Sequence, residues 1–240
     1  MHEPSAPQRG EMYAHAHWYV LSLFIVVFAG FFHTYFAKLS STDLIHHLHA
    51  ITAIGWMVLV VLQSWFITHG RAKWHRAFAK LSFFILPMLV ITGLFMVHAI
   101  LAREPIKIGN PGVIFAFADL TSLVYLAMYY VMAIVYRRDV AQHQRFMLAT
   151  VLVVFPPALG RVLLQQVPLH WSVGGVLAAI YVFSEIIVIV LLVRDWRRER
   201  TVYYAYGFAS VYFLFEIVVW PFLIHYQPWY RFCSWYLGGP

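Results

Sequence analysis

The stretch LIHHLHAITAIGWMVLVVLQSWFI, residues 44–67, decides how the rest of the chain is interpreted. It contains three histidines near its start but no Asp, Glu, Lys or Arg. A helix needs about 20 consecutive, mostly apolar residues to cross the hydrocarbon core of a bilayer. This stretch is therefore predicted to be a transmembrane helix.

Further runs of the same character lie on both sides of this stretch. Short polar segments separate the runs: Asp43 is a helix-start signal, Asn110 and Pro111 form a turn, and Pro168 closes a run. No internal repeat or long linker divides the chain. Residues 1–240 are therefore predicted to form a single all-α domain, a polytopic bundle of seven transmembrane helices at about 17–37, 44–67, 79–100, 113–136, 146–167, 171–193 and 203–225.

The overall composition agrees with a membrane protein. The chain is 62% hydrophobic, 18% aromatic and only 11% charged, and tryptophan and tyrosine are typical of membrane interfaces. A net charge of +7 is explained by basic loops that set the orientation, so no nucleic-acid partner is expected. The single cysteine, Cys233, excludes an internal disulfide and a cysteine-based metal site. No phosphate-binding glycine loop, nucleotide fingerprint or serine nucleophile motif is present.

The basic residues favour one orientation in the membrane. Most Lys and Arg side chains, Arg145 among them, follow the second, fourth and sixth runs. Cytoplasmic loops carry an excess of such residues, so the N-terminus is predicted inside and the C-terminus outside. No small-residue cleavage site follows the first run, and a cleaved signal peptide is not expected. The opposite loops carry only Lys38, Arg103, Lys107 and Arg231.

A layer of polar side chains falls near the outer ends of the predicted helices. Neutral imidazoles from several helices can bind copper, zinc, iron or haem iron, and an acid can orient such a ligand. We therefore predict a transition-metal or haem site near the outer face. The alternative is that each histidine contacts lipid head groups or a helix end. The predicted metal group is His33, His46, His49, His98 and Asp119.

Further residues are predicted to contact the cofactor. His49, Trp56 and Gln63 are seven residues apart and form a stripe on one face of the second helix. Arg161 lies at a depth similar to that of Asp119, and the two are expected to pair, because either charge alone in hydrocarbon is costly.

His75 and His143 mark a second candidate site at the inner face. Each stands close to Lys and Arg residues at the start of a helix, and the two could meet across the bundle. The basic residues are also explained by topology and anionic head groups.

Two acids, Glu185 and Glu216, lie near the centres of the last two predicted helices. A carboxyl group there is expected to be protonated, paired or next to a hydrated cavity. We predict a catalytic role for both, as a proton path or as acid and base. The alternative is a neutral glutamate hydrogen-bonded to a neighbour such as Ser210 or Tyr212.

A resemblance rests on a pattern along predicted helices 2 to 5. The pattern is His49…Trp56…Gln63…Gly70-Arg71…His75-Arg76, then His143-Gln-Arg-Phe-Met and Pro-Pro-Ala-Leu-Gly-Arg161. It resembles a group of uncharacterised bacterial multi-spanning, His-rich membrane proteins. More distantly, the layout resembles membrane proteins that assist haem-copper oxidase maturation, and cytochrome b561-like proteins. These resemblances imply a metal or haem and a place in the bacterial inner membrane.

Three functions agree with these features. The preferred one is a redox protein with a metal or haem centre near the outer face that exchanges electrons with quinone. The second is a zinc-dependent membrane enzyme acting on a lipid-like substrate. The third is a non-catalytic subunit or assembly factor that binds other membrane subunits through its aromatic tail, from Tyr226 onward. A retinal protein is excluded because the last run has no lysine.

Overall fold

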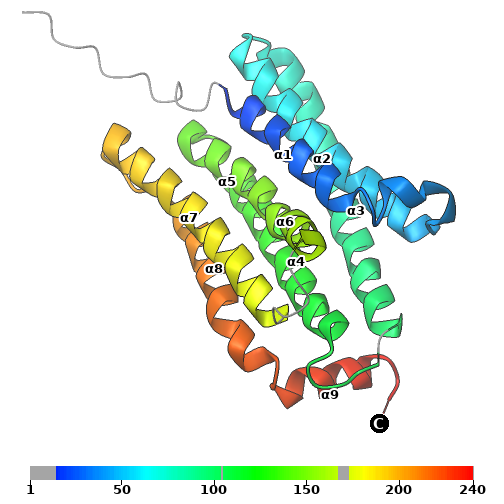
Figure 1. Ribbon diagram of the computed structural model, residues 1–240. Coiled ribbons are helices and arrows are strands. Elements are labelled where there is room, and N and C mark those ends of the chain that lie inside the picture. The colour runs from blue at the N-terminus through cyan, green and yellow to red at the C-terminus, as the bar shows by residue number, and fades with distance from the viewer. Residues whose placement is uncertain (1–14, 104, 167–172, 240) are drawn as a thin grey trace, which may run out of the picture.

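The computed structural model describes residues 15–103, 105–166 and 173–239, and helices make up most of this part of the chain (Figure 1). Among the described residues, six helical stretches are long and apolar enough to cross a membrane. The predicted class, a helical membrane bundle, is therefore confirmed. The elements are α1 (Ala16–Phe31), the 3₁₀ helix η2 (Phe36–Ser41), α2 (Leu44–Thr68), α3 (Ala72–Arg103), α4 (Pro111–Val135), α5 (Val140–Leu152), α6 (Phe155–Gln166), α7 (Val173–Glu199), α8 (Tyr204–Leu223) and α9 (Gln227–Tyr236).

Two of the seven predicted spans differ from the structure. The first, expected over 17–37, ends at Phe31, so α1 has only 16 residues and a turn leads into η2. The fifth, expected as one helix over 146–167, is divided into α5 and α6. The count of seven spans therefore stays a prediction.

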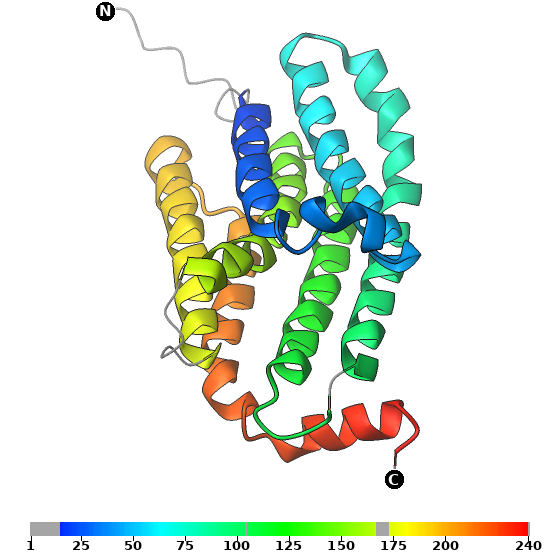
Figure 2. The ribbon, with the colours of Figure 1, turned by 45° about the vertical axis from the view of Figure 1, so that its right-hand side comes forward.

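The division between α5 and α6 has a local cause. Pro156 and Pro157 have no backbone N–H to donate to the preceding turn, and a proline disfavours helical geometry in the residue before it. The helix consequently ends at Leu152 and a new one begins at Phe155. In Figure 2, α6 runs across the bundle rather than along it.

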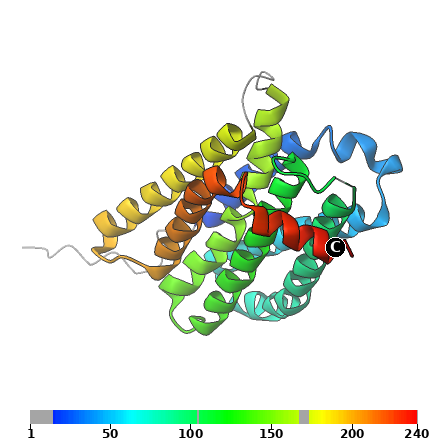
Figure 3. The ribbon, with the colours of Figure 1, turned by 90° about the horizontal axis from the view of Figure 1, so that it is seen from below.

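The two ends of the bundle differ in charge. The connections at residues 69–71, 136–139 and 200–203 lie at the same end of the bundle, and we call this the basic end (Figure 2). The opposite end, here the far end, carries α9, which lies across the ends of α3 and α4 (Figure 3). Trp229 of α9 donates its indole N–H to the Val113 carbonyl at 3.0 Å. Phe232 and Trp235 remain exposed, as expected of an interfacial helix.

Side-chain hydrogen bonds connect the long helices. The Trp56 indole donates to Thr150 at 3.1 Å and joins α2 to α5, while Ser82 and Tyr130 join α3 to α4 at 2.9 Å. The α1–α6 contact requires a glycine: a Cβ atom at Gly30 would collide with the Ala158 carbonyl oxygen.

Candidate functional site

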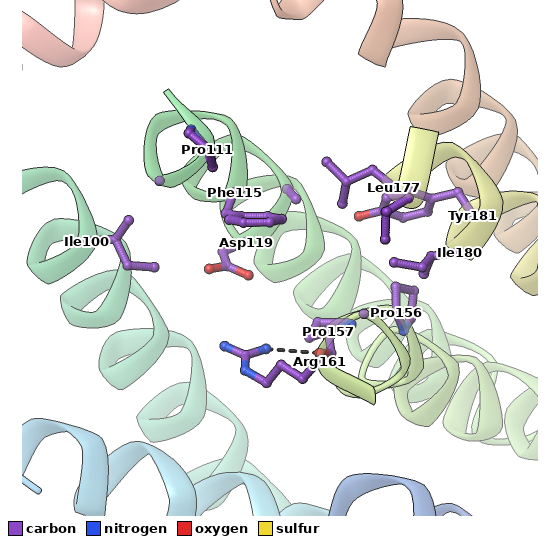
Figure 4. Close-up of a pocket in the computed structure, with 14 residues that line it drawn as sticks. Ile100, Pro111, Phe115, Asp119, Pro156, Pro157, Arg161, Leu177, Ile180 and Tyr181 are labelled. Carbon is purple, nitrogen blue, oxygen red and sulfur yellow. Dashed lines mark hydrogen bonds between the residues drawn. The ribbon is translucent and has the colours of Figure 1, made fainter. Parts of the chain in front are cut away.

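A pocket of about 370 Å³ lies near the far end, between α3, α4, α6 and α7 (Figure 4). Most of its wall is apolar, including Ile100, Phe115 and Ile180. Its charged residues are Asp119 of α4 and Arg161 of α6. The break before α6 creates the pocket, because it changes the direction of the chain. One wall is thereby formed by four residues of α6: Pro156, Pro157, Gly160 and Arg161.

Asp119 and Arg161 face one another across this pocket (Figure 4). They are within electrostatic range, but they do not form the direct ion pair that the sequence predicts. The reason is that Arg161 is held on its own side of the pocket. It donates to the Pro157 carbonyl at 2.9 Å, and its guanidinium carbon lies 4.3 Å from the centre of the Phe31 ring.

Among the predicted outer histidines, His49 is the one that interacts electrostatically with Arg161 of the pocket. It is within electrostatic range of Arg161, and its ring nitrogen is 3.4 Å from the Thr92 hydroxyl, which contacts Thr52 at 3.1 Å. Two other predicted site residues, His49 and Asp119, are therefore within electrostatic range of Arg161.

The other outer histidines have separate surroundings. His46 contacts the Asp43 carboxylate at 2.6 Å, and Arg103 donates to the same carboxylate at 2.8 Å. The hydrogen bonds from His46 and Arg103 hold the pKa of Asp43 below its usual range. His98 contacts the Tyr236 hydroxyl at 3.2 Å, and His33 packs against its neighbour Phe32.

The predicted metal layer is thus not a preformed cluster. In the part of the chain that the structure describes, no group of three or more His, Cys, Asp or Glu residues is close enough to hold a metal ion. Equal depth in the bilayer did not bring the histidines to one point, because each one contacts a different partner: His33 contacts Phe32, His46 contacts Asp43, His49 contacts Thr92 and His98 contacts Tyr236.

At the basic end, the predicted inner pair has matched hydrogen bonds. His75 Nδ1 lies 3.4 Å from the Gln63 carbonyl, and His143 Nδ1 lies 2.8 Å from the Ala133 carbonyl. A carbonyl can only accept, so in each neutral ring Nδ1 carries the proton and Nε2 is left as an acceptor or ligand atom.

The helix register brings this pair close to Gln63. The contact between Trp56 and Thr150 aligns the antiparallel helices α2 and α5. Gln63 lies seven residues, about two turns, from Trp56 on α2, and His143 lies the same distance from Thr150 on α5. Both lie on the side towards the basic end. His75 and His143 are within electrostatic range of one another. Both polar atoms of the Gln63 amide are buried without a hydrogen-bond partner among the described residues.

The two predicted catalytic acids lie inside a polar column between α4, α7 and α8. Thr121 donates to Glu216 at 2.5 Å, and Ser210 donates to Glu185 at 2.5 Å. Ser210, the partner of Glu185, is among the neighbours predicted from the sequence, whereas Thr121, the partner of Glu216, is not. The second oxygen of each carboxyl group is buried without a partner among the described residues.

Arg145, predicted to be one of the basic loop residues, is instead a buried side chain. Its guanidinium is fully buried, donates to Asp195 at 2.6 Å and Glu199 at 2.8 Å, and lies 3.5 Å from the centre of the Tyr203 ring. The spacing of Asp195 and Glu199, one helical turn apart, was the available signal. Burial and a hydrogen bond to Glu199 raise the pKa of Tyr203 to about 12.

No family model, curated protein or solved structure matches this chain. The resemblances described above therefore stay predictions. The pocket, the inner histidine pair and the buried column are the features from which a function can be inferred.

Proposed function

We propose that the chain is a redox protein of the bacterial inner membrane whose far-end pocket binds the ring of a quinone. The observation that carries this proposal is the placement of Asp119 and Arg161, which face into an apolar pocket without an ion pair between them. Charged groups at membrane depth are costly unless a partner satisfies them. A ligand that binds both would supply that partner.

A quinone ring has the matching chemistry. Its carbonyl oxygen accepts a hydrogen bond from the Arg161 guanidinium, and a quinol hydroxyl donates to the Asp119 carboxylate. The ring and its tail suit the apolar wall, which includes Phe115. A lipid phosphate would gain the same arginine but would be repelled by the acid. The pocket therefore favours a neutral ring with polar groups at both ends.

Binding of a short-chain ubiquinone analogue to the purified chain in nanodiscs tests this proposal. Hydrogen bonds to a charged group contribute about 1.5–3 kcal/mol, so Arg161→Ala should weaken binding by roughly 10- to 100-fold. Arg103→Ala removes an exposed arginine at the same end and should leave the affinity unchanged.

A second variant, Asp119→Asn, keeps the shape of the side chain and should lower the affinity for the quinol form more than for the quinone form. The proposal fails if the wild-type chain does not bind the analogue, or if Arg161→Ala binds it equally well. Displacement of the analogue by short-chain phosphatidylglycerol would point instead to a lipid site.

A metal or haem centre is a second candidate, and the inner pair rather than the outer layer favours it. His75 and His143 each have Nδ1 bound to a carbonyl and Nε2 available, beside the unpartnered amide of Gln63. Hydrogen bonds of this kind fix the ring of a metal-binding histidine. Such a centre would supply one-electron redox chemistry, gaining and losing an electron in turn.

Elemental analysis and a reduced-minus-oxidised spectrum of the purified chain test this second candidate. Stoichiometric iron or copper is expected, with loss of it in His75→Ala and in His143→Ala. His98→Ala, at the far end, is the matched control and should retain the metal. A colourless chain without metal, purified from iron- and copper-replete cells, would rule the centre out.

A further inference from the structure

A set of buried hydroxyl and carboxyl groups follows α8 from the pocket towards the basic end. Its members belong to α4, α7 and α8. Tyr212 and Glu216 are both 0% exposed and Tyr181 is 2% exposed, whereas Thr121 and Ser210 are half-buried. The column starts at the pocket, because Tyr181 forms part of the pocket wall.

Hydrogen bonds join α4 to α8 in the half of the column nearer the far end. The Tyr181 ring packs edge-on against the Tyr212 ring, with ring centroids 6.2 Å apart, and the Tyr212 hydroxyl is 2.8 Å from that of Ser122. The next residue of α4, Thr121, donates to Glu216 at 2.5 Å. Two hydrogen bonds between α4 and α8, from neighbouring residues of α4, therefore lie beside the Tyr181 ring of the pocket wall.

The other half leads to the basic end. Tyr129 is within electrostatic range of both Tyr212 and Glu185, and Glu185 accepts from Ser210 at 2.5 Å. Tyr206 lies one turn of α8 beyond Ser210 and is fully buried. One turn further, Tyr203 is hydrogen-bonded to Glu199 in the Arg145 network.

Several atoms of the column have hydrogen-bonding capacity that the described residues do not fill. Oε2 of Glu216 and Oε2 of Glu185 are buried without a partner, as is the indole nitrogen of Trp220, whose ring stacks on Tyr181 of the column. A lost partner costs about 1–3 kcal/mol for a buried polar group. Buried water molecules commonly satisfy such groups, and water would also bridge the intervals between the side chains.

We propose that this column is a proton pathway between the far-end pocket and the basic end of the bundle. Glu216 and Glu185 hold the proton at two positions near the bilayer centre, and the hydroxyl groups pass it on. At each step one O–H bond breaks and another forms on the next oxygen. A carboxyl group takes a proton on one oxygen and releases it from the other. No electron moves, and the electrochemical gradient drives the net transfer.

The pathway is independent of the proposed quinone site, although the two share Tyr181. A ring bound in the pocket would cover the far entrance of the column. A quinone analogue should therefore slow proton transfer without altering any residue of the column.

Proton flux into vesicles containing the purified full-length chain tests the pathway. Vesicles of phosphatidylcholine and phosphatidylglycerol hold a pH-sensitive dye, and a potassium gradient with valinomycin sets the membrane potential. Wild-type vesicles should acidify at least about tenfold faster than empty ones. Glu216→Gln and Glu185→Gln keep the side-chain shape but cannot release a proton, and each should reduce the flux to the level of empty vesicles.

Ser184→Ala is the matched control, because its hydroxyl donates to the Ile180 carbonyl of its own helix, and this variant should conduct like the wild type. Tyr212→Phe removes one hydroxyl from the column and should slow the flux. It keeps the pathway testable if a glutamine variant fails to fold. The pathway is excluded if wild-type vesicles match empty ones, or if both glutamine variants conduct normally. Normal flux that a bound analogue does not slow would contradict the quinone site and leave the pathway intact.

Discussion

At the scale of the residue, Arg145 illustrates how this bundle holds a charge away from water. Its guanidinium is bound by Asp195, Glu199 and the Tyr203 ring, and it also donates to the Ala141 carbonyl. Four partners from several segments therefore replace the water shell. A paired charge of this kind is costly to break, because the remaining partner stays buried and uncompensated.

Asp195→Asn should therefore lower the stability strongly. Removing one partner of a buried ion pair costs about 3–5 kcal/mol, and the variant should unfold at a clearly lower temperature in detergent. Arg198→Gln changes an exposed charge in the last turn of the same helix and should leave the melting temperature unchanged. Equal melting curves for Asp195→Asn and the wild type would contradict the role assigned to Arg145.

Cys233 offers a test of the packing of α9. The side chain is fully buried, and burial raises the pKa of its thiol to about 11. Since the thiolate is the reactive form, maleimide should label the folded chain very slowly at mildly alkaline pH and rapidly after denaturation. Ser234→Cys places a second cysteine on the neighbouring residue for comparison. If Cys233 is labelled as fast in the folded chain as after denaturation, α9 does not pack as described.

At the scale of the element, the sequence predicts most helices and fails where backbone chemistry overrides hydropathy. The run 44–67 corresponds to α2, Leu44–Thr68, because an apolar stretch begins at a capping acid, Asp43, which accepts from the His46 amide. Hydropathy alone predicts one helix over 146–167, whereas the structure has α5 and α6 there. The missing donors of Pro156 and Pro157 divide it, and hydropathy does not register a missing donor.

Replacing the proline pair should change the pocket rather than the fold. In Pro156→Ala/Pro157→Ala, the restored N–H groups favour a straight continuation of α5, which would withdraw Arg161 from the pocket. Binding of the quinone analogue should fall by at least about tenfold, measured by calorimetry. Pro87→Ala is the control, because Pro87 lies inside α3, a helix that continues through it. Unchanged binding in the double variant would show that α6 keeps its place without the prolines.

At the scale of the whole molecule, the sequence predicts depth along the bundle but not direction around it. Hydropathy predicts Asp119, Arg161 and His49 in one layer. In the structure Asp119 and Arg161 line the same pocket, and His49 is within electrostatic range of Arg161. The same reasoning placed His46 and His98 there, although the first contacts Asp43 and the second contacts Tyr236. Which face of a helix meets which neighbour depends on packing and bends, such as the one before α6, that a single sequence does not specify.

The orientation of the molecule can be tested with reporters at its ends. The basic end should face the cytoplasm and α9 the outer surface. Alkaline phosphatase fused after Pro240 should be active, because it folds only outside the cytoplasm, and green fluorescent protein at the same position should be dark. The same two reporters inserted at Gly70 should behave in the opposite way, and the reverse pattern at both sites would invert the proposed topology.

The buried arginine also has a consequence for biosynthesis. Fifty residues separate Arg145 from Asp195, so α5 enters the membrane well before its partner acid has been synthesised. Until α7 arrives, the guanidinium must remain at the aqueous surface near the basic end, and α5 cannot take its final position. Closure of this part of the bundle is therefore a late event of synthesis, and a chain that stops before α7 would present an unpaired arginine to the quality-control proteases of the cell.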